Sequence, residues 1–234
     1  MKLVLFDVDG TLLDAGGSGR WAMTRAFEEV FSIPDAAPFA RSVRFDGMTD
    51  PGILLSIARN AGLDEDDLKR ESAGIERVFL THLARRLEQT PDRRVLPGVV
   101  DLLDRLSGVS MASVGLLTGN IEAGARLKLA SVGLGQYFDL GGFGGDAPDR
   151  AGIGQVARRR FESALKTTIE PSDVIVIGDS TEDVRAGRIN GYRTLAVGTG
   201  WTDRHEILAQ EPELFVEDLA DYARVMQFIF GTRG

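Results

Sequence analysis

Two aspartates stand two positions apart directly after the first apolar stretch of the chain. Residues 3–6 are all apolar, which is typical of a strand buried on both faces of a parallel sheet. Asp7 and Asp9 follow, then Gly10 and Thr11. If the chain stays extended, the two carboxylates point the same way, and like charges so close either raise a carboxyl pKa or require a cation. The pattern suits a nucleophile beside an acid–base group, or a metal site; an ordinary Asp-Gly turn is the alternative.

Two further strand candidates end in polar side chains. Residues 109–117 are followed by Thr118, Gly119 and Asn120, and residues 174–177 are followed by Asp179 and Asp183. In an α/β protein the carboxyl ends of parallel strands meet at one ligand crevice. We therefore expect the polar groups that follow the three strands to lie together.

Four carboxylates in one crevice would repel one another strongly without neutralisation. A hard divalent cation bound through oxygens resolves this, and Mg²⁺ suits a site with few carboxylates and a substrate phosphate. Thr118 offers a hydroxyl, and the backbone amides after it could hold an anion at a helix N-terminus. A metal site, a phosphate site and a free carboxylate side by side suit phosphoryl transfer through covalent catalysis by an aspartate.

The elements that must position these groups alternate between helix and strand from about residue 92 onward. The alternation predicts an α/β fold with a Rossmann-like parallel sheet, right-handed crossovers and helices on both faces. Residues 16–91 instead show helical spacing, with a break at 34–38 and a long helix from 64 to about 87. We therefore predict a discontinuous core, 1–15 and 92–234, interrupted by an all-helical subdomain at 16–91.

Composition excludes several classes of function. The 234 residues carry a net charge of −8 and include no cysteine, which argues against a nucleic-acid partner and excludes disulfides and a cysteine nucleophile. No apolar run is long enough to span a bilayer, and no basic leader precedes the first strand, so we expect no membrane partner, no signal peptide and a cytoplasmic location. A small anionic substrate stays compatible with the acidic charge, because local cations can reverse the sign inside one pocket.

The three polar segments together carry a family resemblance. DVDGT at residues 7–11, LLTGN at 116–120 and IGDSTED at 177–183 resemble, in this order, the signatures of the haloacid dehalogenase superfamily of phosphohydrolases. The match spans nearly the whole core, and the helical insert resembles the cap of the phosphoglycolate phosphatase-like branch. The resemblance implies a phosphatase with Mg²⁺ as cofactor and a small phosphorylated metabolite as substrate.

The resemblance also implies roles for the four aspartates. Asp7 would be the nucleophile that forms an aspartyl-phosphate, while Asp9 would protonate the leaving alcohol and later activate water. Mg²⁺ would be held by Asp7, by the backbone carbonyl of Asp9 and by Asp179. Asp183 would orient these ligands or bind the ion through a water.

Phosphate binding is implied for Thr118 and for the backbone amides of Gly119 and Asn120. The chain departs from the family at the third signature, where members usually place a lysine before the helix that precedes the GD strand. No lysine lies between residues 128 and 166. Arg150 is our candidate for this position, because a guanidinium can hold phosphate and carboxylate bidentately. Lys128 is the alternative if it lies on the inward face of its helix.

The loop at residues 44–50 resembles the segment that such caps present to the active site. It mixes a cation, an aromatic ring and polar groups, so Arg44, Thr49 and Asp50 are candidates for substrate specificity, with a plain loop as the alternative. The Gly-Gly-Ser-Gly segment at 16–19 would be the hinge for cap closure. Trp201 either lines the entrance or packs in the core, and the sequence favours packing.

Two rivals to the phosphatase hypothesis stay open at this point. A phosphomutase of the β-phosphoglucomutase type would use the same aspartyl-phosphate but return the phosphoryl group to a second hydroxyl. A non-catalytic binding or regulatory protein could retain the fold, although a binder has no need for an acid–base group beside a nucleophile. The sequence names neither the phosphomonoester nor the oligomeric state.

Overall fold

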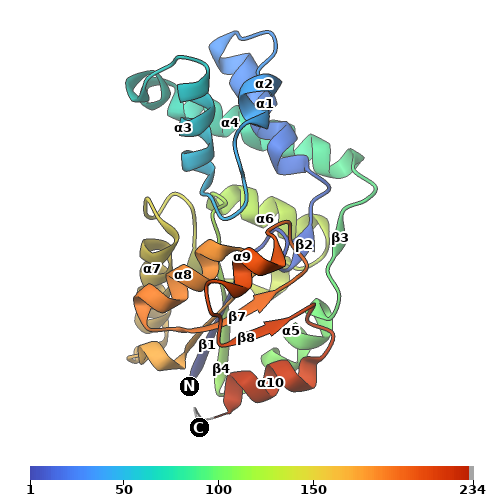
Figure 1. Cartoon of the computed structure of the whole chain (residues 1–234), viewed down its shortest axis with the longest axis vertical. Helices are drawn as coiled ribbons and strands as arrows, with labels where there is room; N and C mark the ends of the chain where they lie inside the picture. Colours follow the sequence, from blue (N-terminus) through green and yellow to red (C-terminus); the bar gives the residue numbers. More distant parts are fainter. Residues whose placement is uncertain (232–234) are drawn as a thin grey trace.

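A six-stranded parallel sheet forms the centre of the larger part of the molecule, which lies below the helical part in Figure 1. The structure is a computed structural model, and it describes residues 1–231. The strand order is β5-β4-β1-β6-β7-β8, so the strand that leads into the first signature is central. The strands are β1 (Lys2–Phe6), β4 (Ala112–Leu117), β5 (Gly141–Gly142), β6 (Val174–Gly178), β7 (Arg193–Val197) and β8 (Leu214–Val216).

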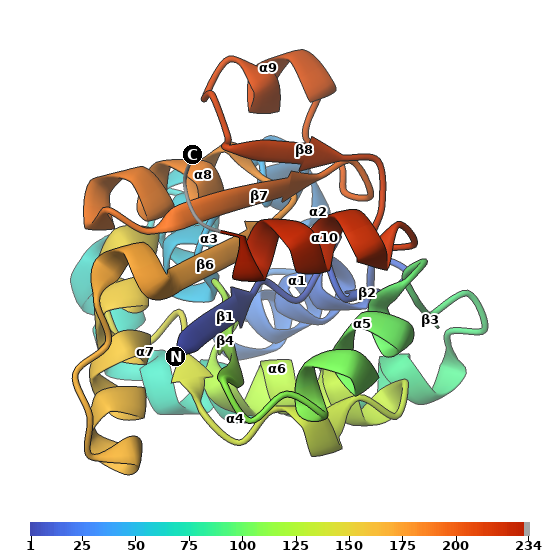
Figure 2. The same cartoon turned by 90° about the horizontal axis from the view of Figure 1, so that it is seen from below.

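Helices cover both faces of this sheet (Figure 2). They are α5 (Val99–Ser107), α6 (Glu122–Ser131), α7 (Arg150–Leu165), α8 (Thr181–Asn190), α9 (Arg204–Leu208) and α10 (Tyr222–Phe230), with short 3-10 turns at Gly135–Tyr137 and Pro171–Asp173. Leu3 and Leu5 of β1 pack in one hydrophobic layer with α7, whereas Val4 and Phe6 pack in another with α5, α6 and α10. The unbroken apolar run of β1 therefore follows from burial on both faces, and the predicted α/β fold is confirmed.

The smaller part is a helical cap. Its helices are α1 (Ser18–Phe31), α2 (Ala37–Arg41), α3 (Asp50–Asn60) and α4 (Glu65–Gln89). The helices α1 and α4 pack against each other, and α1 buries Ala22, Met23, Ala26 and Phe27 at helical spacing. Asp64 begins the long helix α4 through a capping box with Asp67.

A short antiparallel ribbon joins the two parts. Its strands are β2 (Leu13–Asp14) and β3 (Arg94–Val95), placed where the chain leaves the core and where it returns. Two-residue strands leave no periodic pattern, so the ribbon was not predicted. The predicted break at 34–38 contains the start of α2, because Pro38 in the first turn of a helix forfeits no hydrogen bond. None of the helices within residues 1–231 is both long enough and apolar enough to cross a membrane.

Candidate active site

The three signature segments meet at the carboxyl edge of the sheet, on the side that faces the cap. Phe6 of β1 stands in register with Leu116 of β4 on one side and with Ile177 of β6 on the other. The Asp7 amide continues this pairing and donates to the Ile177 carbonyl at 2.9 Å. The register of buried apolar strands thus places the residues that follow them side by side.

A cluster of three buried carboxylates lies at this edge. Asp7, Asp179 and Asp183 each place one oxygen within 4.8 Å of the others, and all three side chains are buried. Burial raises the pKa of Asp7 to about 7, and repulsion from Asp183 acts in the same direction. Burial and repulsion from Asp7 also raise the pKa of Asp179 well above its usual value. A cation would relieve this electrostatic cost, and three clustered oxygens suit a hard divalent ion.

Local sequence fixes the position of Asp179 and Asp183. Ser180 caps the N-terminus of α8, and Asp183 Oδ2 accepts from the Ser180 amide at 3.2 Å and from its hydroxyl at 2.6 Å. Asp183 Oδ1 is buried and accepts no hydrogen bond within residues 1–231, although it forms an ion pair with Arg150. Thr11 Oγ1 donates to Asp179 Oδ1 at 3.1 Å. Gly10 has a φ of +79°, and a Cβ there would lie 2.5 Å from Asp179 Oδ2, so a larger residue would displace that carboxylate.

Arg150 supplies positive charge to the cluster from the first turn of α7. Its guanidinium donates to both oxygens of Asp7, with Nη1 to Oδ1 at 3.3 Å and Nη2 to Oδ2 at 3.4 Å. Its Nε lies 3.2 Å from Asp183 Oδ1. Because an arginine stays protonated even when buried, Arg150 balances part of the negative charge and fixes the Asp7 carboxylate.

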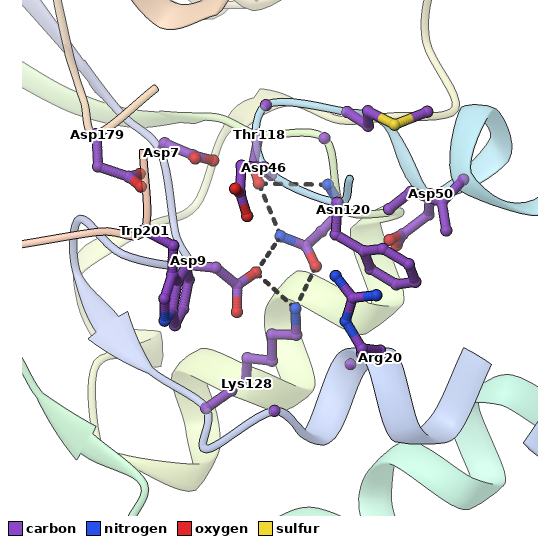
Figure 3. Close-up of a pocket in the computed structure, with 18 of the residues that line it drawn as sticks. Asp7, Asp9, Arg20, Asp46, Asp50, Thr118, Asn120, Lys128, Asp179 and Trp201 are labelled. Carbon is purple, nitrogen blue, oxygen red and sulfur yellow. Dashed lines mark hydrogen bonds and ion pairs between the residues drawn. The ribbon is translucent and has the colours of Figure 1, made fainter. Parts of the chain in front are cut away.

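Asp9 has a separate set of partners. Its Oδ2 accepts from Lys128 Nζ at 2.6 Å and from Asn120 Nδ2 at 2.8 Å. Lys128 also donates to Asn120 Oδ1 at 2.6 Å, and Asn120 Nδ2 donates to Thr118 Oγ1 at 2.8 Å (Figure 3). Burial opposes the charge of Lys128, but the neighbouring carboxylates of Asp9 and Asp50 raise its pKa overall. Lys128 and Asn120 thus hold Asp9 in one orientation.

The two candidates for the basic position both contact signature residues. Arg150 pairs with Asp7 from the start of the helix that precedes the GD strand, and Lys128 pairs with Asp9 from α6. The structure therefore does not require a choice between them. Each of the first two aspartates has its own cation.

The loop from Thr118 to Asn120 connects β4 to α6. The Thr118 amide donates to the Gly142 carbonyl at 3.1 Å, and the Asn120 amide donates to Thr118 Oγ1 at 3.3 Å. Within residues 1–231 the Gly119 amide donates to no acceptor. A Cβ on Gly119 would lie 2.0 Å from the Met48 carbonyl oxygen, because the cap rests directly on this glycine. The loop is thus in contact with both the core and the cap.

A cavity of about 590 Å³ lies between the core and the cap, a size typical of small-molecule sites (Figure 3). Its core wall contains the carboxylates of Asp7, Asp9 and Asp179 and the cations of Lys128 and Arg150. Trp201, with an exposed fraction of 58%, also lines it (Figure 3). Trp201 therefore belongs to the cavity wall, whereas the sequence favoured packing in the core.

The three specificity candidates of the cap loop have different positions. Arg44 is exposed, pairs with Glu206 at 2.6 Å and lies outside the cavity wall. Thr49 begins α3, with its hydroxyl accepting from the Gly52 amide at 3.1 Å, and is also outside the wall. Asp50 is the one of the three that lines the cavity, and it joins the cap to the loop that follows β4. Its amide donates to the Gly119 carbonyl at 2.7 Å, and its Oδ2 accepts from the Ile121 amide at 2.8 Å.

Several site residues were not assigned from the sequence. Thr11 and Ser180 lie inside the signatures, so their hydroxyls were visible there, but their contacts with Asp179 and Asp183 were not. Arg20, on α1, lines the cavity next to residues 16–19, which were assigned only as a hinge. No local pattern marks Arg20, because its position depends on how the cap folds over the core.

The site is an acidic cluster at the carboxyl edge of a parallel sheet, and a helical subdomain covers it. This arrangement is typical of an α/β enzyme whose active site binds a metal ion. The sequence profile of the haloacid dehalogenase-like hydrolases matches residues 1–191. The chain belongs to this family, and the resemblance carried by the three signatures is confirmed.

Comparison with individual known proteins shows which members of the family this chain is similar to. The chain is 28% identical over 226 residues to a phosphoglycolate phosphatase of Synechococcus elongatus, covering 94% of this chain and 95% of that protein. A phosphoglycolate phosphatase of Chromobacterium violaceum is 28% identical over 228 residues, covering 97% of both chains. The crystal structure of a hydrolase from Pseudomonas syringae has the same fold, with a TM-score of 0.71 at 21% identity, covering 98% of this chain and 99% of that chain. Over nearly its whole length the chain is thus similar to proteins named phosphoglycolate phosphatases.

Proposed function

We propose that this protein is a Mg²⁺-dependent phosphatase that hydrolyses a small phosphomonoester through an aspartyl-phosphate on Asp7, with phosphoglycolate as the leading substrate. The observation that carries the proposal is the division of two neighbouring aspartates between different environments. Both line the cavity, but Asp7 is paired with Arg150 in the buried cluster, whereas the more exposed Asp9 is paired with Lys128. A nucleophile and an acid–base group need such different surroundings. The names of the relatives support the substrate.

The reaction would proceed in two steps on these side chains. In the first, an Asp7 oxygen bonds to phosphorus while the ester bond breaks, and Asp9 gives a proton to the leaving oxygen. In the second, the Asp9 carboxylate takes a proton from water as the water oxygen bonds to phosphorus and the bond to Asp7 breaks. Thr118, the Gly119 amide and Arg150 would hold the phosphoryl oxygens while their charge develops.

The residues present fit a divalent metal ion. Asp7, Asp179 and Asp183 would hold it, because each places one buried carboxylate oxygen within 4.8 Å of the others, with Arg150 beside Asp183 Oδ1. The resemblance adds the backbone carbonyl of Asp9. Mg²⁺ in this cluster would neutralise the buried carboxylates and polarise a phosphoryl oxygen.

Phosphate release from a panel of metabolite phosphates and one aryl phosphate tests the reaction class. We expect release with Mg²⁺, background rates with EDTA, and recovery when excess Mg²⁺ is added back, because the buried carboxylates require a cation. Phosphoglycolate should have the highest kcat/KM in the panel. A folded protein that releases no phosphate from any compound would contradict the proposal, and a positional isomer in place of free phosphate would indicate the mutase instead.

Asp50→Ala tests the contact between the cap and the segment that follows β4, residues 118–121. A hydrogen bond to a charged group contributes ~1.5–3 kcal/mol. Losing the Asp50–Ile121 bond should therefore reduce the fraction of molecules in which the cap covers the site, and this should raise KM about tenfold or more, with a smaller change in kcat. Steady-state kinetics at about pH 8 are suitable, since burial raises the pKa of Asp50 to about 6 and its carboxyl is then ionised. Asp64→Ala, which removes the cap of α4 on the same subdomain, is the control. Equal KM values for Asp50→Ala and wild type would sink this assignment.

A further inference from the structure

The three basic side chains that line the cavity differ in their partners. Arg150 pairs with Asp7, and Lys128 pairs with Asp9. Arg20, in the first turn of α1, has no carboxylate within 4.0 Å among residues 1–231. Asp46 lies in the same wall and acts on Arg20 electrostatically, but its ion-pair partner is Arg44 at 3.6 Å. Among the described residues, Arg20 is therefore the one cation of the cavity wall that no carboxylate contacts directly.

Arg20 is held in place without using all of its donors. Its Nη1 donates to the carbonyls of Ala40 at 2.9 Å and Val43 at 3.3 Å. Its guanidinium lies over the Phe45 ring, 3.7 Å from the ring centroid. A guanidinium carries five N–H donors, and Nε and Nη2 of Arg20 donate to no acceptor within the described part of the chain. A cation fixed in this way loses little conformational freedom when it binds an anion.

Contacts along the cavity wall place Arg20 on the side of the leaving group. Asp9, which would protonate the leaving oxygen, is bonded to Lys128. A Cβ on Gly19 would lie 3.2 Å from Lys128 Nζ, so the residue before Arg20 packs against that lysine. Figure 3 shows the Arg20 guanidinium directed into the cavity from the helix that runs past Lys128. The part of a substrate beyond its ester oxygen would extend from Asp9 toward Arg20.

We propose that Arg20 is the residue that selects the leaving group, by binding the carboxylate of a small hydroxy acid such as the glycolate of the proposed substrate. This inference rests on the proposed phosphatase function. A guanidinium and a carboxylate match in two parallel hydrogen bonds. The single negative charge of a carboxylate also matches the single positive charge of Arg20. A substrate with a second phosphoryl group at this position would bring more negative charge close to Asp46 and Asp50, which line the same wall.

The ratio of kcat/KM for phosphoglycolate to that for ethyl phosphate tests the contact. Ethyl phosphate has a methyl group where phosphoglycolate has its carboxylate. We expect the wild-type kcat/KM for phosphoglycolate to be about tenfold to a hundredfold higher than that for ethyl phosphate. Arg20→Met should remove most of this preference, and Arg20→Lys should retain part of it. Arg25→Met should keep it, because Arg25 lies on the same helix but pairs with Glu28. A preference unchanged in Arg20→Met, or an equal loss on both esters, would overturn the proposal.

Calorimetric binding of the same two esters to Asp7→Asn enzyme tests the contact without turnover. Phosphoglycolate should bind more tightly than ethyl phosphate, and adding Arg20→Met should abolish the difference; a difference that persists would also overturn the proposal. Absence of turnover with every ester would instead count against the phosphatase function. Thermal unfolding of Arg20→Met reports any loss from the bonds to Ala40 and Val43, and Arg20→Lys supplies the comparison if the methionine variant does not fold.

Discussion

Replacing Asp7 by asparagine is expected to lower kcat by about 10⁴-fold or more, which is the usual scale for loss of a nucleophile that acts within a catalytic set. The amide keeps the size of the side chain but cannot form the covalent bond to phosphorus. Arg150 and the loop at residues 118–120 can still position the phosphoryl group, but this cannot replace the missing nucleophile. Steady-state phosphate release with Mg²⁺ measures the effect.

Asp173→Asn is the matched control for this variant. Asp173 pairs with Lys2 at 2.6 Å and precedes β6, at the end of the sheet opposite to the site. Its substitution changes one carboxyl in the same core but should leave kcat within about threefold of wild type, as expected for a surface pair. Substantial turnover by folded Asp7→Asn would contradict the nucleophile assignment.

Arg150→Met should lower kcat/KM by about 10³-fold, since it removes both the charge beside Asp7 and a donor for the phosphoryl oxygens. It should also destabilise the protein in EDTA, because losing one partner of a buried ion pair costs about 3–5 kcal/mol. Mg²⁺ should recover part of that stability by neutralising the same carboxylates. Kinetics together with urea unfolding, with and without Mg²⁺, measure the two effects.

Arg159→Met separates these effects from loss of any arginine on α7. Arg159 is exposed on the same helix, so its substitution should change stability by no more than about 0.5 kcal/mol. Arg150→Lys should retain more activity than Arg150→Met, because it keeps the charge without the bidentate geometry. If Arg150→Met matched Arg159→Met in both assays, Arg150 would have no role in the site.

The fold of the core and the position of the acidic cluster could be predicted from the sequence for a physical reason. A parallel sheet needs continuous apolar strands, and the polar residues that end them must gather at one edge, so Asp7, Thr118 and Asp179 could be placed together before the structure was known. Asp183 was harder to assign, since its capping box with Ser180 and its ion pair with Arg150 are details of side-chain geometry that the sequence does not show.

Contacts between the cap and the core were beyond prediction because no local pattern encodes them. Asp50 was one of three equal candidates in a loop, and only the packing of that loop on Gly119 distinguishes it from Arg44 and Thr49. Arg20 follows a glycine-rich hinge and shows no signal of its own. Lys128 was considered only as a substitute for Arg150, because the partner of a buried lysine depends on which strand end its helix covers.

The most direct test of the central claim is to trap the phosphoryl group on Asp7. Asp9→Asn enzyme with an aryl phosphate is suited to this, because an aryloxide leaves without a proton whereas hydrolysis of the intermediate needs the base. We expect a burst of phenol equal to the enzyme concentration in the presence of Mg²⁺, and a peptide phosphorylated at Asp7 after acid quench and proteolysis. Asp7→Asn and EDTA should abolish both. A burst without phosphorylated Asp7, or phosphate found on another residue, would contradict the proposed mechanism.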